Sequence, residues 1–158
     1  MHKEHQYELT LTWTGNKGTG TSHYTAYERS HQITINNKAT INASSDAPFR
    51  GDGTKHNPED LLLASLSSCH MLWYLHLCAD AGVVVNTYSD NPIGTLSLNE
   101  QGSGKFTSVT LKPKVIVADA GMIDKAMELH HQANKMCFIA NSVNFKVDHH
   151  PEINVVEK

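Results

Sequence analysis

The sequence has few cysteines, only two arginines and no basic run, and each shortage excludes a class of protein. Three cysteines, spaced far apart and without a CxxC pair, do not make the disulfide framework of a small secreted protein. A net charge of −3 without a basic cluster gives no indication of nucleic acid or an anionic membrane as a partner. The first residues, MHKEHQYE, lack the apolar stretch of an export signal, so we expect a cytoplasmic protein.

The length of 158 residues suits one domain with a hydrophobic core of its own. No repeat, low-complexity segment or linker interrupts the sequence, so residues 1–158 are predicted to form a single domain. In the reducing compartment that we expect, the cysteines serve either packing or chemistry.

The longest segment with a single structural interpretation is residues 57–82, NPEDLLLASLSSCHMLWYLHLCADAG. Asn57 can cap a helix, Pro58 suits its first position, and Gly82 is a natural residue just past its end. These signals predict a helix over residues 58–81, and its apolar residues on nearly all sides predict burial against several partners. Its central part has no formal charge. Three serines, two histidines and the lack of a second such segment nevertheless favour a core helix over a membrane span.

Alternating or apolar runs predict strands on both sides of this helix. The predicted strands cover residues 7–13, 24–27, 33–35, 40–43, 83–87, 93–98, 106–117 and 144–147. Residues 119–136 carry apolar side chains on one face and polar ones on the other, which predicts a second helix. The order of strands, long helix, strands, helix and strand predicts an α+β protein whose sheet packs on the central helix.

Three cysteines allow three pairs, and helix geometry excludes one of them. Cys78 follows Cys69 by nine residues, so it faces the opposite side of the helix about 13 Å along the axis and cannot form a disulfide with Cys69. Cys78 is therefore interpreted as a packing residue. Cys137 falls where the second helix ends and a short helical turn is expected, and helix N-terminal amides lower the pKa of a thiol. Because the second helix of such a fold packs beside the first, we expect Cys69 and Cys137 to meet.

A cysteine in the middle of a helix needs a nearby cation to become a thiolate. Arg50, in the loop before the helix, or Arg29, near the second strand, can supply it. A carboxylate can orient the guanidinium, and Glu59 or Asp60 is nearest in sequence to Arg50. Glu59 lies about 15 Å along the helix from Cys69. A site that uses both residues must therefore be built between two chains, which predicts a homodimer.

These features resemble the OsmC/Ohr family of thiol peroxidases. The matching features are the segment NPEDLLLASLSSC with Glu59 ten residues before Cys69, an arginine-bearing loop just before it, and Cys137 after an amphipathic helix. The order of elements agrees over essentially the whole chain. The resemblance implies a fold of β-sheets wrapped around a long central helix in an intertwined homodimer.

The resemblance also implies a role for each site residue. Cys69 would be the peroxidatic thiolate and Cys137 the resolving thiol. Glu59 would orient the arginine. The position of Arg50 matches the arginine of the OsmC branch, whereas in the Ohr branch the arginine comes from an earlier strand or turn, which would favour Arg29. We prefer Arg50.

The activity that this resemblance implies is the reduction of organic hydroperoxides to alcohols through a Cys69 sulfenate and a Cys69–Cys137 disulfide. No bound cofactor or metal is expected; an external dithiol, for which the resemblance suggests a dihydrolipoyl group, would reduce the disulfide. Apolar neighbours in the sequence favour organic hydroperoxides over hydrogen peroxide; they are Leu66, Met71, Trp73 and Phe138. One departure is His70, because relatives carry phenylalanine or another apolar residue after the first cysteine. This histidine can alter the polarity or the substrate of the pocket.

Three rival hypotheses stay open at this point. The first is a metal site, for which the histidines at positions 2, 5, 130, 131, 149 and 150 are candidates with cysteine or aspartate, although no HxxxH spacing is present. The second is a hydrolase with Cys69 and His70 as nucleophile and base, although neighbours in a helix point apart. The third is a non-enzymatic protein on the same scaffold, either a redox sensor or a binding module. The thiols of a sensor would be oxidised once, without turnover.

Overall fold

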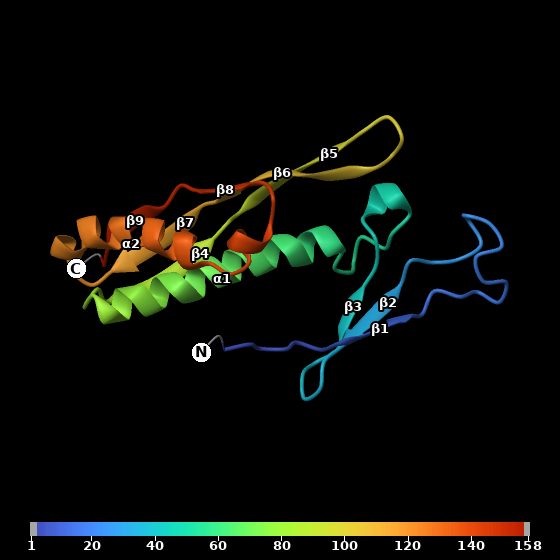
Figure 1. Cartoon of the computed structure of the whole chain (residues 1–158), viewed down its shortest axis with the longest axis horizontal. Helices are drawn as coiled ribbons and strands as arrows, with labels where there is room; N and C mark the ends of the chain where they lie inside the picture. The colour runs from blue at the N-terminus through green and yellow to red at the C-terminus, as the bar shows by residue number, and fades with distance from the viewer. Residues whose placement is uncertain (1–2, 157–158) are drawn as a thin grey trace. The chain divides into compact units, whose positions relative to one another are not determined.

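A computed structural model describes residues 3–156, an α+β chain with two α-helices and three small sheets (Figure 1). The α+β class is as predicted. The chain divides into two compact units, one up to Leu61 and the other from Leu62 onward. A single domain over residues 1–158 stays a prediction.

The first unit contains a three-stranded antiparallel sheet in the order β1-β2-β3. Its strands are β1 (Thr10–Trp13), β2 (His31–Thr34) and β3 (Ile41–Ala43). A 3₁₀ turn, η1 (Ala47–Phe49), follows β3, and at its start the carboxylate of Asp46 accepts a hydrogen bond from the amide of Ala47. Arg50 ends this turn in the left-handed backbone region, at φ 61°.

Residues 24–27, predicted as a strand, form turns and bends instead. The guanidinium of Arg29 donates hydrogen bonds to the carbonyl oxygens of Tyr24, at 2.7 Å, and of Tyr27, at 2.6 Å. Both carbonyl groups thus have a hydrogen-bond partner without a neighbouring strand. A local side-chain contact therefore overrides the strand pattern here.

The long helix α1 (Pro58–Asp80) begins where the sequence predicts and ends one residue before the predicted end. It starts in the last residues of the first unit and continues through the second. The side-chain oxygen of Asn57 accepts a hydrogen bond from the amide of Asp60 at 2.8 Å, which caps the first turn. Gly82, at φ 72°, then reverses the chain in the conformation that favours glycine after a helix.

Two three-stranded sheets and the second helix complete the second unit (Figure 1). The order of one sheet is β4-β7-β9, and that of the other is β5-β6-β8. Their strands are β4 (Val85–Asp90), β5 (Ile93–Leu98), β6 (Gly104–Leu111), β7 (Pro113–Val117), β8 (Lys146–His149) and β9 (Glu152–Val155). Helix α2 (Ile123–Met136) follows the 3₁₀ turn η2 (Ala120–Met122), and a third turn, η3 (Ala140–Ser142), comes after it.

The single long strand predicted over residues 106–117 is two strands that belong to different sheets. The break falls at Lys112, whose amide donates a hydrogen bond to the carboxylate of Asp90 at 2.7 Å. Pro113, which follows, has no amide hydrogen to donate to a sheet. The strand β9 was not predicted, because the last strand predicted from the sequence ends at residue 147.

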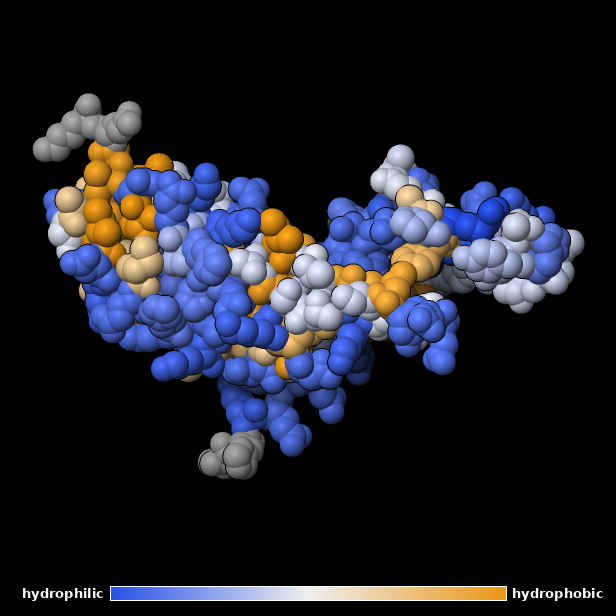
Figure 2. Space-filling model, turned by 90° about the horizontal axis from the view of Figure 1, so that it is seen from above, coloured by the Kyte–Doolittle hydropathy of each residue, from blue (hydrophilic) through white to orange (hydrophobic). Residues whose placement is uncertain are grey.

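Every fourth residue of α1 turns into the core of the second unit. These buried residues are Leu66, His70, Tyr74 and Cys78. The other side of the helix is not covered within one chain, and Leu72 is 63% exposed. The predicted burial of α1 on several sides is therefore not met by a single chain. Apolar side chains reach the surface of both units (Figure 2).

By length and composition, α1 is the one helix of the described residues that could cross a membrane. The core helix of a non-membrane protein passes the same test. Tyr74 and Cys78 pack in one hydrophobic cluster with α2 and the sheet β4-β7-β9, and Leu66 packs in a second cluster with β6.

Candidate functional site

The structure brings two of the predicted site residues together in the second unit. Cys69 lies in the middle of α1, and Cys137 directly follows the last residue of α2. Both are free thiols, and the thiol of Cys69 lies close enough to influence the titration of Cys137. Cys69 is half-buried, whereas Cys137 is only 1% exposed. Of the two residues, Cys69 is the more exposed.

Burial controls the protonation of Cys137. It raises the pKa of the Cys137 thiol to about 11, and the neighbouring Cys69 thiol adds to the increase. The amide of Ala140 donates a hydrogen bond to the Cys137 sulfur at 3.4 Å, and this contact with the following turn lowers the pKa, as the sequence predicts. Burial outweighs the effect of the amides on the pKa of Cys137, so the predicted low pKa is wrong.

The third cysteine has a different environment. Cys78 lies in the hydrophobic cluster formed by α1, α2 and the sheet β4-β7-β9, and it is 1% exposed. Burial raises the pKa of its thiol. This placement agrees with its interpretation as a packing residue.

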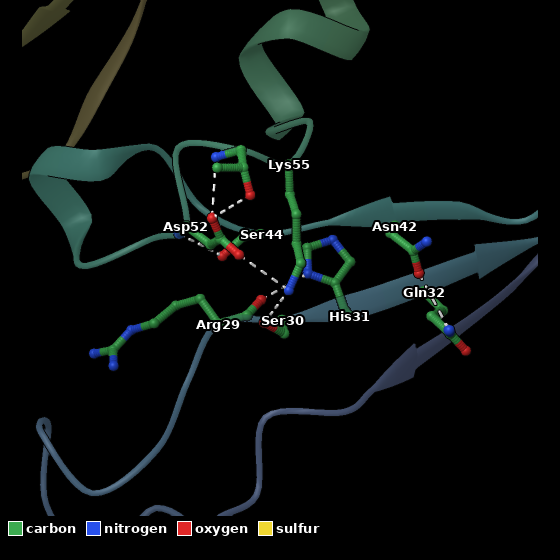
Figure 3. Close-up of polar contacts among 9 residues, drawn as sticks. Arg29, Ser30, His31, Gln32, Asn42, Ser44, Asp52 and Lys55 are labelled. Atoms are coloured by element: carbon green, nitrogen blue, oxygen red, sulfur yellow. Dashed lines mark hydrogen bonds and ion pairs between the residues drawn. The ribbon is translucent and has the colours of Figure 1, made fainter.

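Arg29 and Arg50 both belong to the first unit, and their surroundings differ. The guanidinium of Arg29 lies 4.3 Å from the ring centre of Tyr24 and 4.2 Å from that of Tyr27, in addition to its two carbonyl contacts. Figure 3 shows this side chain pointing away from the polar group around Asp52 and Lys55. Arg50 is exposed, and its guanidinium lies 5.9 Å from the Tyr24 ring centre.

Both arginines line one pocket of about 270 Å³ in the first unit. Its lining residues are Glu28, Arg29, Ser30, Ser44, Arg50, Gly51 and Asp52. Hydrogen bonds from Thr54 lower the pKa of the Asp52 carboxyl to about 2, with a smaller contribution from Lys55. Lys55 also donates a hydrogen bond to Ser30 at 2.8 Å (Figure 3). The pocket therefore has charged groups of both signs.

Glu59, predicted to orient the arginine, lies in the first turn of α1. Among residues 3–156, no ion pair joins Glu59 to either arginine. Within one chain, the carboxylate that shares a pocket with the arginines is that of Asp52. The role of Glu59 stays a prediction.

The second unit contains a histidine cluster, and the sequence did not predict the part that His70 plays in it. Nε2 of His70 and Nδ1 of His130 are joined by a hydrogen bond of 3.0 Å, and both rings are fully buried. Nε2 of His149 and Nδ1 of His131 form a second pair at 3.1 Å. The sequence signal for the first pair was one histidine on the apolar stripe of each helix. Because the two histidines are 60 residues apart, no local sequence pattern indicates that they pair.

The cluster bears on two rival hypotheses. His70 bonds to His130, which argues against a hydrolase in which His70 activates Cys69. The residues at positions 130, 131 and 149 do lie together, but within the described part of the chain no three His, Cys, Asp or Glu residues are placed to hold one metal ion. His2, another candidate ligand, lies outside the described residues.

A protein-family model for OsmC-like proteins matches residues 51–151, which is more than half of the chain and includes both cysteines of the site. The chain belongs to the OsmC-like family. No curated protein sequence matches it. Among solved structures, an OsmC-like protein of unknown function from Vibrio cholerae is 29% identical. The similarity covers 94% of this chain and 100% of that protein, with a TM-score of 0.83.

More distant OsmC-like structures share the fold. An organic hydroperoxide resistance protein from Elizabethkingia anophelis is 16% identical, with a TM-score of 0.68 over 98% of this chain and 100% of that one. The organic hydroperoxide resistance protein OsmC from Legionella pneumophila is 17% identical, with a TM-score of 0.67 over 96% of this chain and 100% of that one. The OsmC-like fold of this chain is thus that of a family that includes hydroperoxide resistance proteins.

Proposed function

We propose that the chain is a thiol-dependent peroxidase that reduces organic hydroperoxides to alcohols. The observation that carries the proposal is the placement of two free thiols together, one half-buried on α1 and one sealed at the end of α2. Membership in the OsmC-like family supports it, because distant structural relatives are named as organic hydroperoxide resistance proteins.

In the proposed reaction, the Cys69 thiolate attacks the distal oxygen of the hydroperoxide. A sulfur–oxygen bond forms, the oxygen–oxygen bond breaks, and the leaving alkoxide takes up a proton to become the alcohol. The Cys137 thiol then attacks the sulfenic sulfur of Cys69, and its proton leaves with the hydroxyl group as water. An external dithiol, for which we propose a dihydrolipoyl group, reduces the resulting disulfide by thiol–disulfide exchange.

The difference between the two thiols supports this order of events. Peroxides react with thiolates, and a pKa of about 11 leaves Cys137 protonated at neutral pH. Its side chain is also almost inaccessible. Cys137 is therefore protected from direct oxidation and reacts only after Cys69 has become a sulfenic acid.

We propose Arg50 as the arginine that stabilises the Cys69 thiolate and the charge that develops on the peroxide oxygens. The guanidinium of Arg29 already donates to two carbonyl oxygens and contacts the faces of two tyrosine rings. The Arg50 side chain is exposed and is free of such contacts with carbonyl groups among the described residues. In the proposed assembly, Glu59 orients Arg50.

The proposed active unit is an intertwined homodimer in the cytoplasm, with the site completed between two chains. Apolar surface in each unit supports this assembly, since Leu11 of β1 is 60% exposed and Leu72 of α1 is 63% exposed. Contiguous apolar side chains that are exposed in one chain indicate an interaction surface.

The deciding experiment maps the cysteines that one equivalent of cumene hydroperoxide links. Mass spectrometry after alkylation should find a Cys69–Cys137 disulfide and a free Cys78. Cys69→Ser should lower the rate of peroxide consumption by more than about a hundredfold, because it removes the nucleophile. Cys78→Ser is the matched control and should keep the wild-type rate. If Cys69→Ser consumes the peroxide at the wild-type rate, the proposed mechanism is wrong.

A redox sensor is the second candidate function. The observation that favours it is that the contacts that shift the pKa of Cys137 come from Cys69, Ile139 and Ala140, and none of them comes from an arginine. A pair of thiols can be oxidised without an arginine that activates peroxide. Turnover separates the two functions: an enzyme consumes many equivalents of peroxide when dithiol is added, and a sensor consumes one.

A further inference from the structure

The two helices that carry the thiols each have one histidine on an otherwise apolar inner face. On α1, His70 lies in the buried stripe between Leu66 and Tyr74. On α2, the inner face consists of Ala126, Leu129, His130 and Ala133. His70 and His130 meet with their ring nitrogens 3.0 Å apart, and both rings are 0% exposed.

Among the described residues, this contact is the one hydrogen bond of each buried ring. The outer nitrogens, Nδ1 of His70 and Nε2 of His130, are buried without a partner among the described residues. Because each ring has only this bond, displacing one helix against the other would leave four buried ring nitrogens without partners. Such groups cost free energy when they are buried unpaired. Apolar contacts between helices tolerate small displacements, whereas a buried polar pair favours one register.

Other side-chain hydrogen bonds hold α2 to a strand. His131 pairs with His149 of β8, and the side-chain amide of Asn134 donates to the carbonyl oxygen of Val147 at 3.1 Å. Among residues 3–156, the bond between His70 and His130 is the side-chain hydrogen bond that joins α1 to α2. The register of the two helices therefore depends on this pair more than on any other polar contact.

Each histidine belongs to the helix that carries one of the thiols or leads directly into it. His70 directly follows Cys69, so a displacement of one moves the other. Cys137 follows His130 by seven residues, which is about two turns, and it therefore lies near the same face of α2. The register in which the imidazoles meet is also the register in which the thiols meet.

We propose that His70 and His130 are positioning residues whose hydrogen bond holds α1 and α2 in the register that lets Cys69 and Cys137 form a disulfide. The inference rests on the proposed function, in which these two thiols are linked. The hydrogen bond and the disulfide stabilise the same register, so they are thermodynamically coupled, and each strengthens the other.

The test measures the equilibrium constant of the Cys69–Cys137 disulfide against a dithiol–disulfide buffer, with alkylation and mass spectrometry as the readout. His70→Phe keeps an aromatic ring but removes the hydrogen bond, and it should lower the constant roughly five- to tenfold. His70→Gln places an amide near the position of Nε2 and should stay within about twofold of wild type. His76→Phe changes a mostly exposed histidine of the same helix and should also stay within about twofold.

A second measurement needs no substitution. In protein with ¹⁵N-labelled histidine, nuclear magnetic resonance measures how fast the ring N–H proton of the His70–His130 hydrogen bond exchanges with water. Reciprocal coupling predicts slower exchange in the oxidised protein than in the reduced one. Equal exchange in both states, or an unchanged disulfide constant in His70→Phe, would overturn the inference and leave the proposed function intact. A wild-type protein whose two thiols never link would overturn both.

Discussion

At the scale of single residues, burial in the second unit gives side chains of the same type different exposures and different pKa values. Cys69 is half-buried, whereas burial raises the pKa of Cys137 to about 11 and also raises that of Cys78. Burial lowers the pKa of His70 to about 4 and that of His130 to about 3. Both imidazoles are therefore neutral at physiological pH, and one donates a hydrogen bond to the other.

These histidines predict a loss of stability in mild acid. An imidazole in the unfolded chain takes up a proton as the pH falls below about 6.5, whereas His70 and His130 stay neutral until about 4 and about 3. Between pH 6.5 and 4 the unfolded state binds more protons. The free energy of unfolding should therefore fall as the pH falls, by up to about 1.4 kcal/mol per pH unit for each histidine.

Urea unfolding at pH 7, 6 and 5 measures this slope. Neighbouring groups reinforce its sign, because burial also lowers the pKa of His149, and His131 and His150 add to the decrease, while Asp148 opposes it. The hydroxyl groups of Tyr74 and Tyr88 stay protonated in this range, since burial raises their pKa. His70→Gln should reduce the slope and His76→Gln should not. Equal stability at pH 7 and pH 5 would contradict the prediction.

Contacts that follow from the regular geometry of a helix were predicted from the sequence more successfully than contacts that depend on tertiary structure. A nine-residue spacing excludes a Cys69–Cys78 disulfide, and the expected packing of two helices brings Cys69 near Cys137. No comparable rule links His70 to His130, because the pairing depends on the rotation of both helices. The pKa of Cys137 was mispredicted for a similar reason, since the amides are visible in the sequence and the degree of burial is not.

At the scale of elements, the terminal signals of α1 were the most reliable. Asn57, Pro58 and Gly82 define both ends through local backbone geometry, and the helix follows them within one residue. The strand predicted over residues 106–117 failed because the interaction that interrupts it comes from Asp90, on another strand. Local signals therefore predict the ends of a helix, and distant contacts decide the ends of a strand.

The left-handed conformation of Gly82 leads to a prediction for the end of α1. Its φ of 72° is unfavourable for residues with a side chain, and nothing lies within 4 Å of the position that a Cβ would occupy. Gly82→Ala should therefore lower the free energy of unfolding by about 1 kcal/mol through backbone strain alone. Gly82→Asn is the matched control, because asparagine tolerates this conformation, and it should recover part of the loss. Chemical denaturation that finds both variants as stable as wild type would refute this explanation.

At the scale of the whole molecule, a single chain leaves one side of its longest helix uncovered. Burying the exposed surface of Leu72 against a second chain would remove apolar surface from water, and this gain supports the proposed homodimer. The sequence predicted an assembly from the spacing of Glu59 and Cys69. It could not predict which face of α1 pairs, because apolar residues surround that helix.

A charge at this face tests the assembly. Leu72→Asp should convert a dimer into a monomer of 17.5 kDa, because an aspartate cannot be buried there without a partner. Light scattering coupled to size-exclusion chromatography measures the mass directly. Asn86→Asp adds the same charge at an exposed position of β4 and should leave the dimer unchanged. A wild-type mass of 17.5 kDa at micromolar concentration would exclude the homodimer.

An aromatic contact bridges the two segments that carry the thiols. The rings of Trp73, one turn after Cys69, and Phe138, directly after Cys137, meet edge to face with their centres 5.5 Å apart. We therefore expect formation of the disulfide to alter the surroundings of this indole, whereas Trp13 belongs to the other unit. The molecule thus contains its own fluorescent probe, and the emission of Trp73 can follow each oxidation in real time without an attached dye.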